Sequence, residues 1–164
     1  MIRVLFLFSV VFLAACQTEK PIFHIYGPDG HRNDFLYMAE STNVPPVARK
    51  AMMAFLSPAE IVESEEIVYK HFGMIHQAAQ FNLRVFLKIG NRWDRDYQFL
   101  LRTYTREGKF IDSFVLAEWV TETKSYCFGE LYLDMVIHQS CEEGQSFRPV
   151  ARIQEDGRFV RIND

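Results

Sequence analysis

A strict alternation of apolar and polar side chains over residues 81–89 constrains the fold of this chain more than any other feature. The segment reads FNLRVFLKI. Successive side chains of a β-strand point to opposite faces, so a period of two gathers one apolar row on one face. We therefore predict a strand with one buried face. The apolar row consists of Phe81, Leu83, Val85, Leu87 and Ile89.

Similar segments joined by short turns follow. YQFLLRTY (97–104) and FIDSFVLAEW (110–119) flank the turn TREGK, and FRPVARIQ (147–154) and RFVRI (158–162) flank the turn EDG. Strands joined by such short loops run antiparallel. Together with a hairpin around residue 134, these segments predict an antiparallel β-meander of about six to seven strands.

The part before this meander has a helical pattern. In residues 42–60, two prolines suit a helix start, and apolar residues then recur at a four-residue step. Ser57-Pro58-Ala59-Glu60 has the form of a capping box, which predicts a second short helix from Pro58. By Ile67-Val68-Tyr69 the composition favours a strand. The predicted fold class is α+β, with N-terminal short helices followed by the meander, in one domain over residues 22–164.

Residues 1–15 have the three parts of a secretory signal. Arg3 supplies the charge, the apolar run begins at Val4, and it ends in Ala14 and Ala15. That run is twelve residues long, whereas a helix that crosses the bilayer needs about twenty. We therefore expect residues 1–15 to be cleaved.

The end of this segment, Leu13-Ala14-Ala15-Cys16, resembles the lipobox of bacterial lipoproteins. The resemblance implies that diacylglycerol is attached to Cys16, that cleavage occurs just before it, and that residues 16–21 form a lipidated tether. In such lipoproteins an Asp after the cysteine retains the protein at the inner membrane. Gln17 stands there in this chain, which implies the outer membrane, with the domain facing the periplasm. The alternative is a short uncleaved anchor with an incidental cysteine.

The two other cysteines, Cys127 and Cys141, would lie in an oxidising envelope compartment, where disulfides persist. A disulfide requires the chain to reverse between them, with Asp134 at the midpoint. In that hairpin Gly129 lies opposite Gln139, Leu131 lies opposite Ile137, and Glu130 faces His138. The alternative is two separate buried thiols.

Composition and motifs exclude several functions. The formal net charge is −3 and there is no basic cluster, which argues against a nucleic-acid partner. The sequence contains no nucleophile elbow, no Walker loop, no Gly-x-Gly-x-x-Gly and no Cys-x-x-Cys. We therefore expect no cofactor and name no catalytic residue.

Histidines and carboxylates give only weak candidates. The spacing of His71 and His76 suits neither one helix face nor one strand face, and His31 with Asp34 is a poor metal pattern, so we expect no metal site. The carboxylates around the second predicted helix suit a solvated face better than a hydrolase site. The residues concerned are His24, His31, His71, His76 and His138, and Glu60, Glu63, Glu65 and Glu66.

The charged loop GNRWDRD is the candidate surface for binding a partner, with Arg92, Trp93, Asp94 and Arg95 as its residues. Trp and Arg are enriched where interfaces concentrate their binding energy. The alternative is an indole ring that folds back over a sheet edge. We expect Trp119, at the end of a predicted strand, to belong to the core.

The leading functional hypothesis is an envelope-anchored lipoprotein without catalytic activity that binds another protein. It would be an inhibitor or immunity-type protein, or a small subunit of an envelope assembly. The alternatives are an envelope hydrolase with a carboxylate/His site and a carrier of a small apolar ligand. A pocket with converging Glu and His side chains would favour the hydrolase. A dry cavity would favour the ligand carrier, and a filled core would favour the protein-binding lipoprotein.

Overall fold

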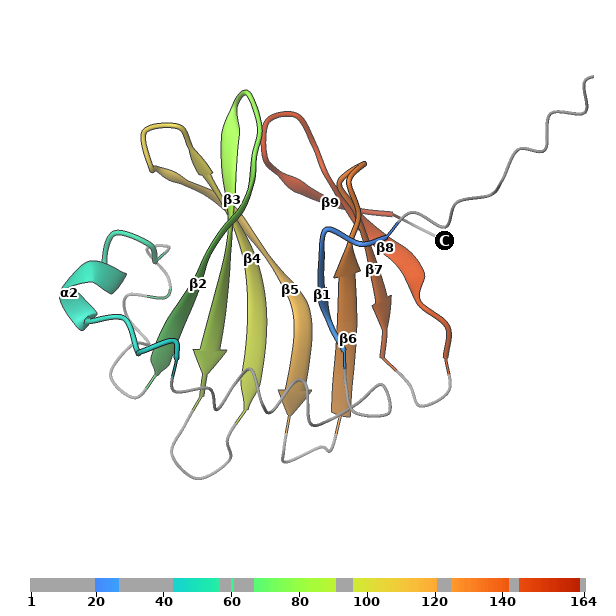
Figure 1. Ribbon diagram of the computed structural model, residues 1–164, viewed down its shortest axis with the longest axis horizontal. Helices are drawn as coiled ribbons and strands as arrows, with labels where there is room; N and C mark the ends of the chain where they lie inside the picture. The colour runs from blue at the N-terminus through green and yellow to red at the C-terminus, as the bar shows by residue number, and fades with distance from the viewer. Residues whose placement is uncertain are drawn as a thin grey trace, which may run out of the picture.

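In the computed structural model of this chain, nine antiparallel strands form one curved sheet (Figure 1). The structure describes residues 20–26, 43–56, 60, 67–90, 96–120, 125–141 and 145–162. The sheet order is β2-β3-β4-β5-β6-β7-β8-β9, and β1 pairs with β6. The strands are β1 (Phe23–Ile25), β2 (Val68–Gln77), β3 (Phe81–Ile89), β4 (Tyr97–Thr105), β5 (Phe110–Val120), β6 (Ser125–Leu131), β7 (Val136–Ser140), β8 (Arg148–Ile153) and β9 (Phe159–Arg161).

The predicted α+β class is wrong, because the described chain is nearly all β. The helix α2 (Arg49–Met52) spans four residues, and the second predicted helix lies outside the described residues except for Glu60. Residues before α2 add to the sheet instead: Pro46 bridges Lys70, and Val47 N donates to Tyr69 O at 2.8 Å. A helix this short is held by packing rather than by its own hydrogen bonds, so local propensity overstated it. None of the helices in the described ranges has the length and hydropathy needed to span a bilayer.

An antiparallel meander is present, but the sheet has nine strands rather than the predicted six to seven. The strand β3 has the predicted bounds, and β6 and β7 pair in the predicted register, with Glu130 opposite His138. Sequence analysis did not assign β2 in full. Its register shifts between His71 and Gly73 and again between Met74 and His76. Two irregularities in ten residues disrupt the period-two pattern that identifies a strand.

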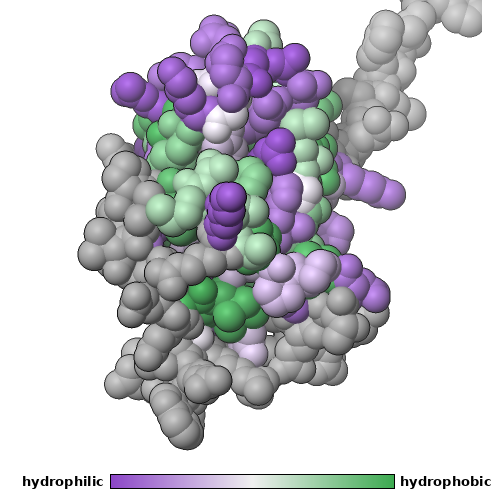
Figure 2. All heavy atoms as spheres, turned by 90° about the vertical axis from the view of Figure 1, so that its left-hand side faces the viewer, coloured by the Kyte–Doolittle hydropathy of each residue, from purple (hydrophilic) through white to green (hydrophobic). Residues whose placement is uncertain are grey.

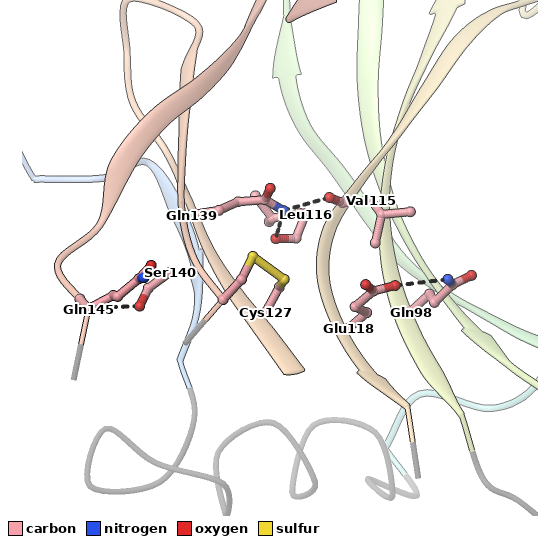
Figure 3. Close-up of a disulfide and its surroundings, with 9 residues drawn as sticks. Gln98, Val115, Leu116, Glu118, Cys127, Gln139, Ser140 and Gln145 are labelled. Atoms are coloured by element: carbon pink, nitrogen blue, oxygen red, sulfur yellow. Dashed lines mark hydrogen bonds between the residues drawn. A yellow bond between two sulfur atoms is a disulfide. The ribbon is translucent and has the colours of Figure 1, made fainter. Parts of the chain in front are cut away.

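β6 is the strand at which the sheet divides. Its first residues, Ser125–Cys127, pair with β5, whereas its last residues, Gly129–Leu131, pair with β1. β5 passes over β6 at Gly129, where an added Cβ would collide with the Leu116 carbonyl oxygen. Beyond this crossing, Gln139 Nε2 of β7 donates to the carbonyls of Val115 (2.8 Å) and Leu116 (2.9 Å), as Figure 3 shows. These bonds satisfy β5 carbonyls that β6 no longer reaches.

The main core lies between the two halves of the divided sheet. Thr103 Oγ1 on β4 donates to the Gly157 carbonyl oxygen in the β8–β9 turn at 2.6 Å, which ties the halves together. Trp119 packs against this core, as predicted. Its buried members are Ile25, Phe81, Leu83, Val85, Leu87, Tyr97, Phe99, Leu101, Leu116, Ala117, Leu131, Ile137, Ala151 and Ile153.

A second apolar cluster covers the opposite face of β2–β5. Met52 and Leu56 from the segment 43–56 pack there against Tyr69, Phe86 and Tyr104. Figure 2 views the molecule from this side: hydrophilic residues gather at the end where the hairpin tips lie, and apolar residues lie lower on the face. Exposed large apolar side chains on or beside α2 and β2 are Met53, Val68 and Met74.

Candidate functional site

Two of the sites predicted from sequence lie outside the described residues. Cys16 is one, and the loop containing Arg92, Trp93, Asp94 and Arg95 is the other. At the base of that loop, Gly90 N donates to Asp96 O at 2.8 Å, so the loop connects β3 to β4. Lipidation of Cys16 and partner binding at Trp93 remain predictions.

The predicted disulfide is confirmed. Cys127 on β6 and Cys141, which follows β7, are bonded, with Cα atoms 3.9 Å apart (Figure 3). A cleft of about 540 Å³ lies beside it. Asp112 at this cleft accepts from the backbone N of Ser113 (2.8 Å) and of Phe159 (2.9 Å). This carboxylate therefore joins β5 to β9 and has a structural role.

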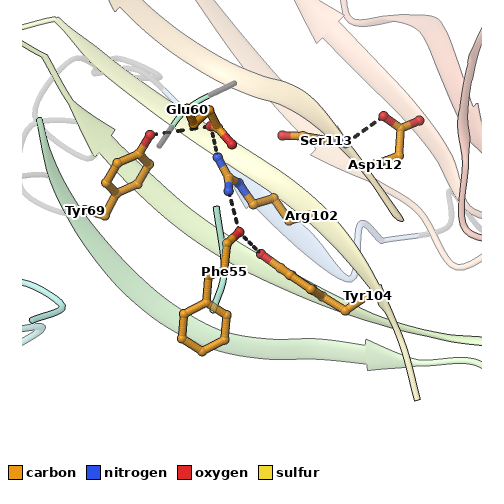
Figure 4. A network of polar contacts seen from close by, with 7 residues as sticks. All are labelled: Phe55, Glu60, Tyr69, Arg102, Tyr104, Asp112 and Ser113. Atoms are coloured by element: carbon orange, nitrogen blue, oxygen red, sulfur yellow. Dashed lines mark hydrogen bonds and ion pairs between the residues drawn. The ribbon is translucent and has the colours of Figure 1, made fainter. Parts of the chain in front are cut away.

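A buried polar network joins β4 to the segment that covers it (Figure 4). Arg102 is fully buried and pairs with Glu60, and its Nη1 donates to the Phe55 carbonyl oxygen at 2.8 Å. Tyr104 Oη donates to the same carbonyl at 2.9 Å. The guanidinium carbon lies 5.6 Å from the ring centroid of Tyr69, which adds a cation–π contact.

This network has a structural role and is not an open binding site. Glu60 is not part of a solvated helix face, because its carboxylate meets the buried Arg102. Burial raises the pKa of Tyr69 and of Tyr104 to about 12, and the Glu60 carboxylate further raises that of Tyr69. Both phenols therefore remain protonated donors. The network fastens Phe55 and Glu60 to the outer face of the sheet.

The cleft at the hairpin-tip end has the residue types of a hydrolase but a different arrangement. Its volume is about 1000 Å³, and His76, Asp134 and Asp156 line it. Asp134 accepts from Val136 N at 3.1 Å and Asp156 from Arg158 N at 3.0 Å. These aspartates close the β6–β7 and β8–β9 turns. The two carboxylates are thus engaged by the hairpins that carry them.

The most distinctive arrangement lies on the outer face of β1, β6 and β7, where we define the Glu130 cluster as His24, Tyr26, Glu130, Tyr132 and His138. Register places His24 on β1 and His138 on β7 directly opposite Glu130 on β6. The three side chains therefore form a row across three strands. Glu130 Oε1 accepts from Tyr26 Oη and its Oε2 from Tyr132 Oη, both at 2.7 Å.

Rings surround this carboxylate. His24 stacks on Tyr26 with centroids 4.4 Å apart, and His138 lies 4.7 Å from Tyr132. Glu130 is 8% exposed, His24 is exposed, and the other three rings are half-buried. The cluster is thus a carboxylate set among aromatic rings on a face that solvent reaches.

The electrostatics of the cluster fix its hydrogen-bond directions. The hydrogen bond to Glu130, together with burial, raises the pKa of Tyr132 to about 12. Burial and the same carboxylate also raise the pKa of Tyr26. Both tyrosines therefore stay protonated and donate, while Glu130 accepts. Within the described part of the chain, no ion pair neutralises this carboxylate.

Sequence reasoning found only half of this cluster. It paired Glu130 with His138 through the cysteine register, but it did not place the N-terminal strand beside β6. The sequence does contain one signal. His24 and Tyr26 are two residues apart, as are Glu130 and Tyr132, so the members of each pair lie on the same face of their strand. A local pattern could not show that two such strands are neighbours.

No family model, curated protein or solved structure matches this chain. Within the described ranges, no group of three or more His, Cys, Asp or Glu side chains is arranged to hold a metal ion. The geometry of the Glu130 cluster is therefore the basis for proposing a function.

Proposed function

We propose that this chain is an envelope-anchored lipoprotein without catalytic activity that binds another protein, as an inhibitor, an immunity-type protein or a small subunit of an envelope assembly. Lipid on Cys16 holds it to the outer membrane, and residues 22–164 face the periplasm. Each buried acyl methylene contributes about 0.8 kcal/mol, and two or more chains give stable anchoring. The domain then needs no membrane-inserted surface of its own.

The observation that supports binding is the Glu130 cluster. Tyr26, Tyr132 and two histidines stand around a carboxylate on an outer sheet face, whereas the interior is filled by fully buried apolar side chains. Tyrosine is enriched at interface positions that carry much of the binding energy, because its rigid ring offers contact area and its hydroxyl a hydrogen bond.

The two alternatives have less support. A carrier needs an empty apolar cavity, whereas the core residues of β3, β4, β7 and β8 belong to one cluster of buried side chains. A hydrolase needs a free acid and base, and Asp134 and Asp156 in the hairpin-tip cleft are hydrogen-bonded within their own turns.

The test is chemical cross-linking of the native lipidated protein in envelopes, followed by detergent extraction and mass spectrometry. We expect one envelope protein to be recovered in a stoichiometric amount. Substrate turnover by the purified protein, or no cross-linked partner, would contradict the proposal. Trp93→Ala and Glu130→Gln, each compared with wild type, identify which surface holds the partner, and Glu155→Gln removes a carboxylate at the exposed β8–β9 turn as the control.

A further inference from the structure

We propose that the Glu130 cluster is a receptor for an arginine side chain, supplied by the protein partner. This inference rests on the proposed function only for the source of the arginine. The chemistry of the site comes from the charge, the free acceptor positions and the rings around Glu130.

The negative charge of Glu130 favours binding of a cation. Its carboxylate is largely buried, and its two hydrogen-bond partners are neutral phenols. A buried carboxylate costs free energy unless it is paired as well as hydrogen-bonded. Arg102 and Glu60, on the other half of the sheet, show how this fold neutralises a buried charge when it does so internally.

The acceptor geometry favours a guanidinium over an ammonium. A carboxylate has two acceptor positions on each oxygen. Tyr26 uses one position on Oε1 and Tyr132 uses one on Oε2, so one position remains on each oxygen. A guanidinium presents two parallel N–H groups that match such a pair of oxygens, whereas an ammonium is a point donor.

The aromatic rings around Glu130 provide surfaces on which a guanidinium group can stack. Tyr26 is stacked on His24 with 19° between the ring planes, and Phe147 meets Tyr26 edge-on at 5.7 Å. Tyr132 and His138 form the other pair. Planar guanidinium groups stack on such rings and gain a cation–π attraction that neutral side chains lack. An arginine arriving from solvent meets these partly exposed rings before it meets the carboxylate.

The experiment titrates the mature lipidated protein in detergent micelles with N-acetyl-arginine methylamide, followed by amide NMR shifts of residues 129–139. N-acetyl-lysine methylamide and N-acetyl-citrulline methylamide serve as the point-charge and neutral comparisons. We expect saturable shifts with the arginine probe and binding at least about tenfold weaker with the other two, the ratio expected for one lost charge-assisted contact.

Glu130→Gln keeps the side-chain shape and removes the charge, so it should abolish the arginine response, while Glu155→Gln should leave it unchanged. Should Glu130→Gln fail to fold, Glu130→Asp retains the charge but withdraws the carboxylate, and it should weaken the arginine probe by about tenfold. Equal binding of arginine and citrulline, tighter binding of lysine, or no saturable shift would overturn the inference. Recovery of a cross-linked partner together with any of these results would leave the proposed function in place.

Discussion

Gly129 shows how a single residue position controls the division of the sheet. The backbone of β5 crosses β6 above it, and a methyl group there would meet the Leu116 carbonyl oxygen and side chain. From the sequence alone, Gly129 is only one member of an alternating strand. The need for glycine arises from the close approach of β5 to β6, which the alternation pattern of neither strand reveals.

Gly129→Ala should therefore lower the free energy of unfolding by about 2 to 3 kcal/mol, as overpacking against backbone does. Urea denaturation measures this. Gly90→Ala is the matched control, since its added Cβ would lie at an ordinary 3.5 Å from Asp96 Cβ, and it should change stability by no more than about 0.5 kcal/mol. Equal stabilities of the two variants would show that β5 does not pass this close to β6.

His71 gives the fold a dependence on pH. Burial lowers the pKa of His71 below its usual 6.5, and the neighbouring Arg84 lowers it further. The ring lies 4.6 Å from Phe86 and stacks on it. Since the unfolded chain binds the proton more readily than the folded one, the stabilising effect is complete above pH 6.5 and is lost as the pH falls through the lowered folded pKa.

Urea midpoints measured between pH 7.5 and about pH 5 should therefore fall with decreasing pH in the wild-type protein. In His71→Asn, which cannot titrate in this range, the fall should be smaller. Parallel curves for the two proteins would assign the acid sensitivity to other groups.

At the scale of elements, one buried ion pair adds to the apolar packing that holds the covering segment on the sheet. Arg102 is fully buried, and Glu60 supplies its carboxylate. Removing one partner of a buried pair leaves an uncompensated charge, whereas replacing both can be nearly neutral. The covering segment should thus loosen when only Glu60 changes.

Glu60→Gln should lower the free energy of unfolding by about 3 kcal/mol and speed tryptic cleavage after the exposed Lys50. The double variant Glu60→Gln/Arg102→Met should regain most of this stability. Additive losses in the double variant, measured by the same urea titration, would mean that the pair does not couple the segment to the sheet.

The disulfide fastens the β6–β7 hairpin on which the Glu130 cluster is built. Cys127 and Cys141 close a loop with a sequence separation of 14 residues. Replacing both by serine should lower the free energy of unfolding by about 2 to 3 kcal/mol. Non-reducing mass mapping of the wild-type protein should find the two peptides joined, and two freely alkylated thiols would contradict the bond.

Regular strands are predictable from this sequence, and the contacts between distant strands are not. β3 and the β6–β7 register follow from alternation and from the cysteine spacing. The segment with Pro45, Pro46 and Met52 has a helical pattern, yet the edge of β2 recruits part of it as extended chain. The Glu130 cluster needs β1 beside β6, and nothing local in either strand specifies that pairing.

At the scale of the whole molecule, the predicted anchor at Cys16 lies close in sequence to β1, one of the three strands that carry the Glu130 cluster. Phe23, the first residue of β1, lies seven positions after Cys16, and extended chain spans at most about 3.5 Å per residue. A lipid on Cys16 would hold β1, and with it the Glu130 cluster, within about 25 Å of the membrane surface. The proposed partner must then also reach that layer.

Cys16→Ser should abolish lipid labelling and leave the protein unprocessed or mislocalised. Metabolic labelling with a radioactive fatty acid and fractionation of envelopes measure both effects. Cys127→Ser is the control, because it removes a cysteine outside the lipobox and should leave labelling intact. Normal membrane retention of Cys16→Ser would show that the anchor is not this lipid.

The pairing of β1 with β6 also constrains the order in which strands can pair during folding. Tyr26 and Glu130 are 104 residues apart, so the first strand of the chain emerges long before its partner exists. It can form its strand pairing only once β6 is present. Any pull on the N-terminal end of the chain then acts on a strand of three residues, secured mainly by the buried Ile25. A lipid on Cys16, as proposed, would transmit any pull on the anchor first to this short strand.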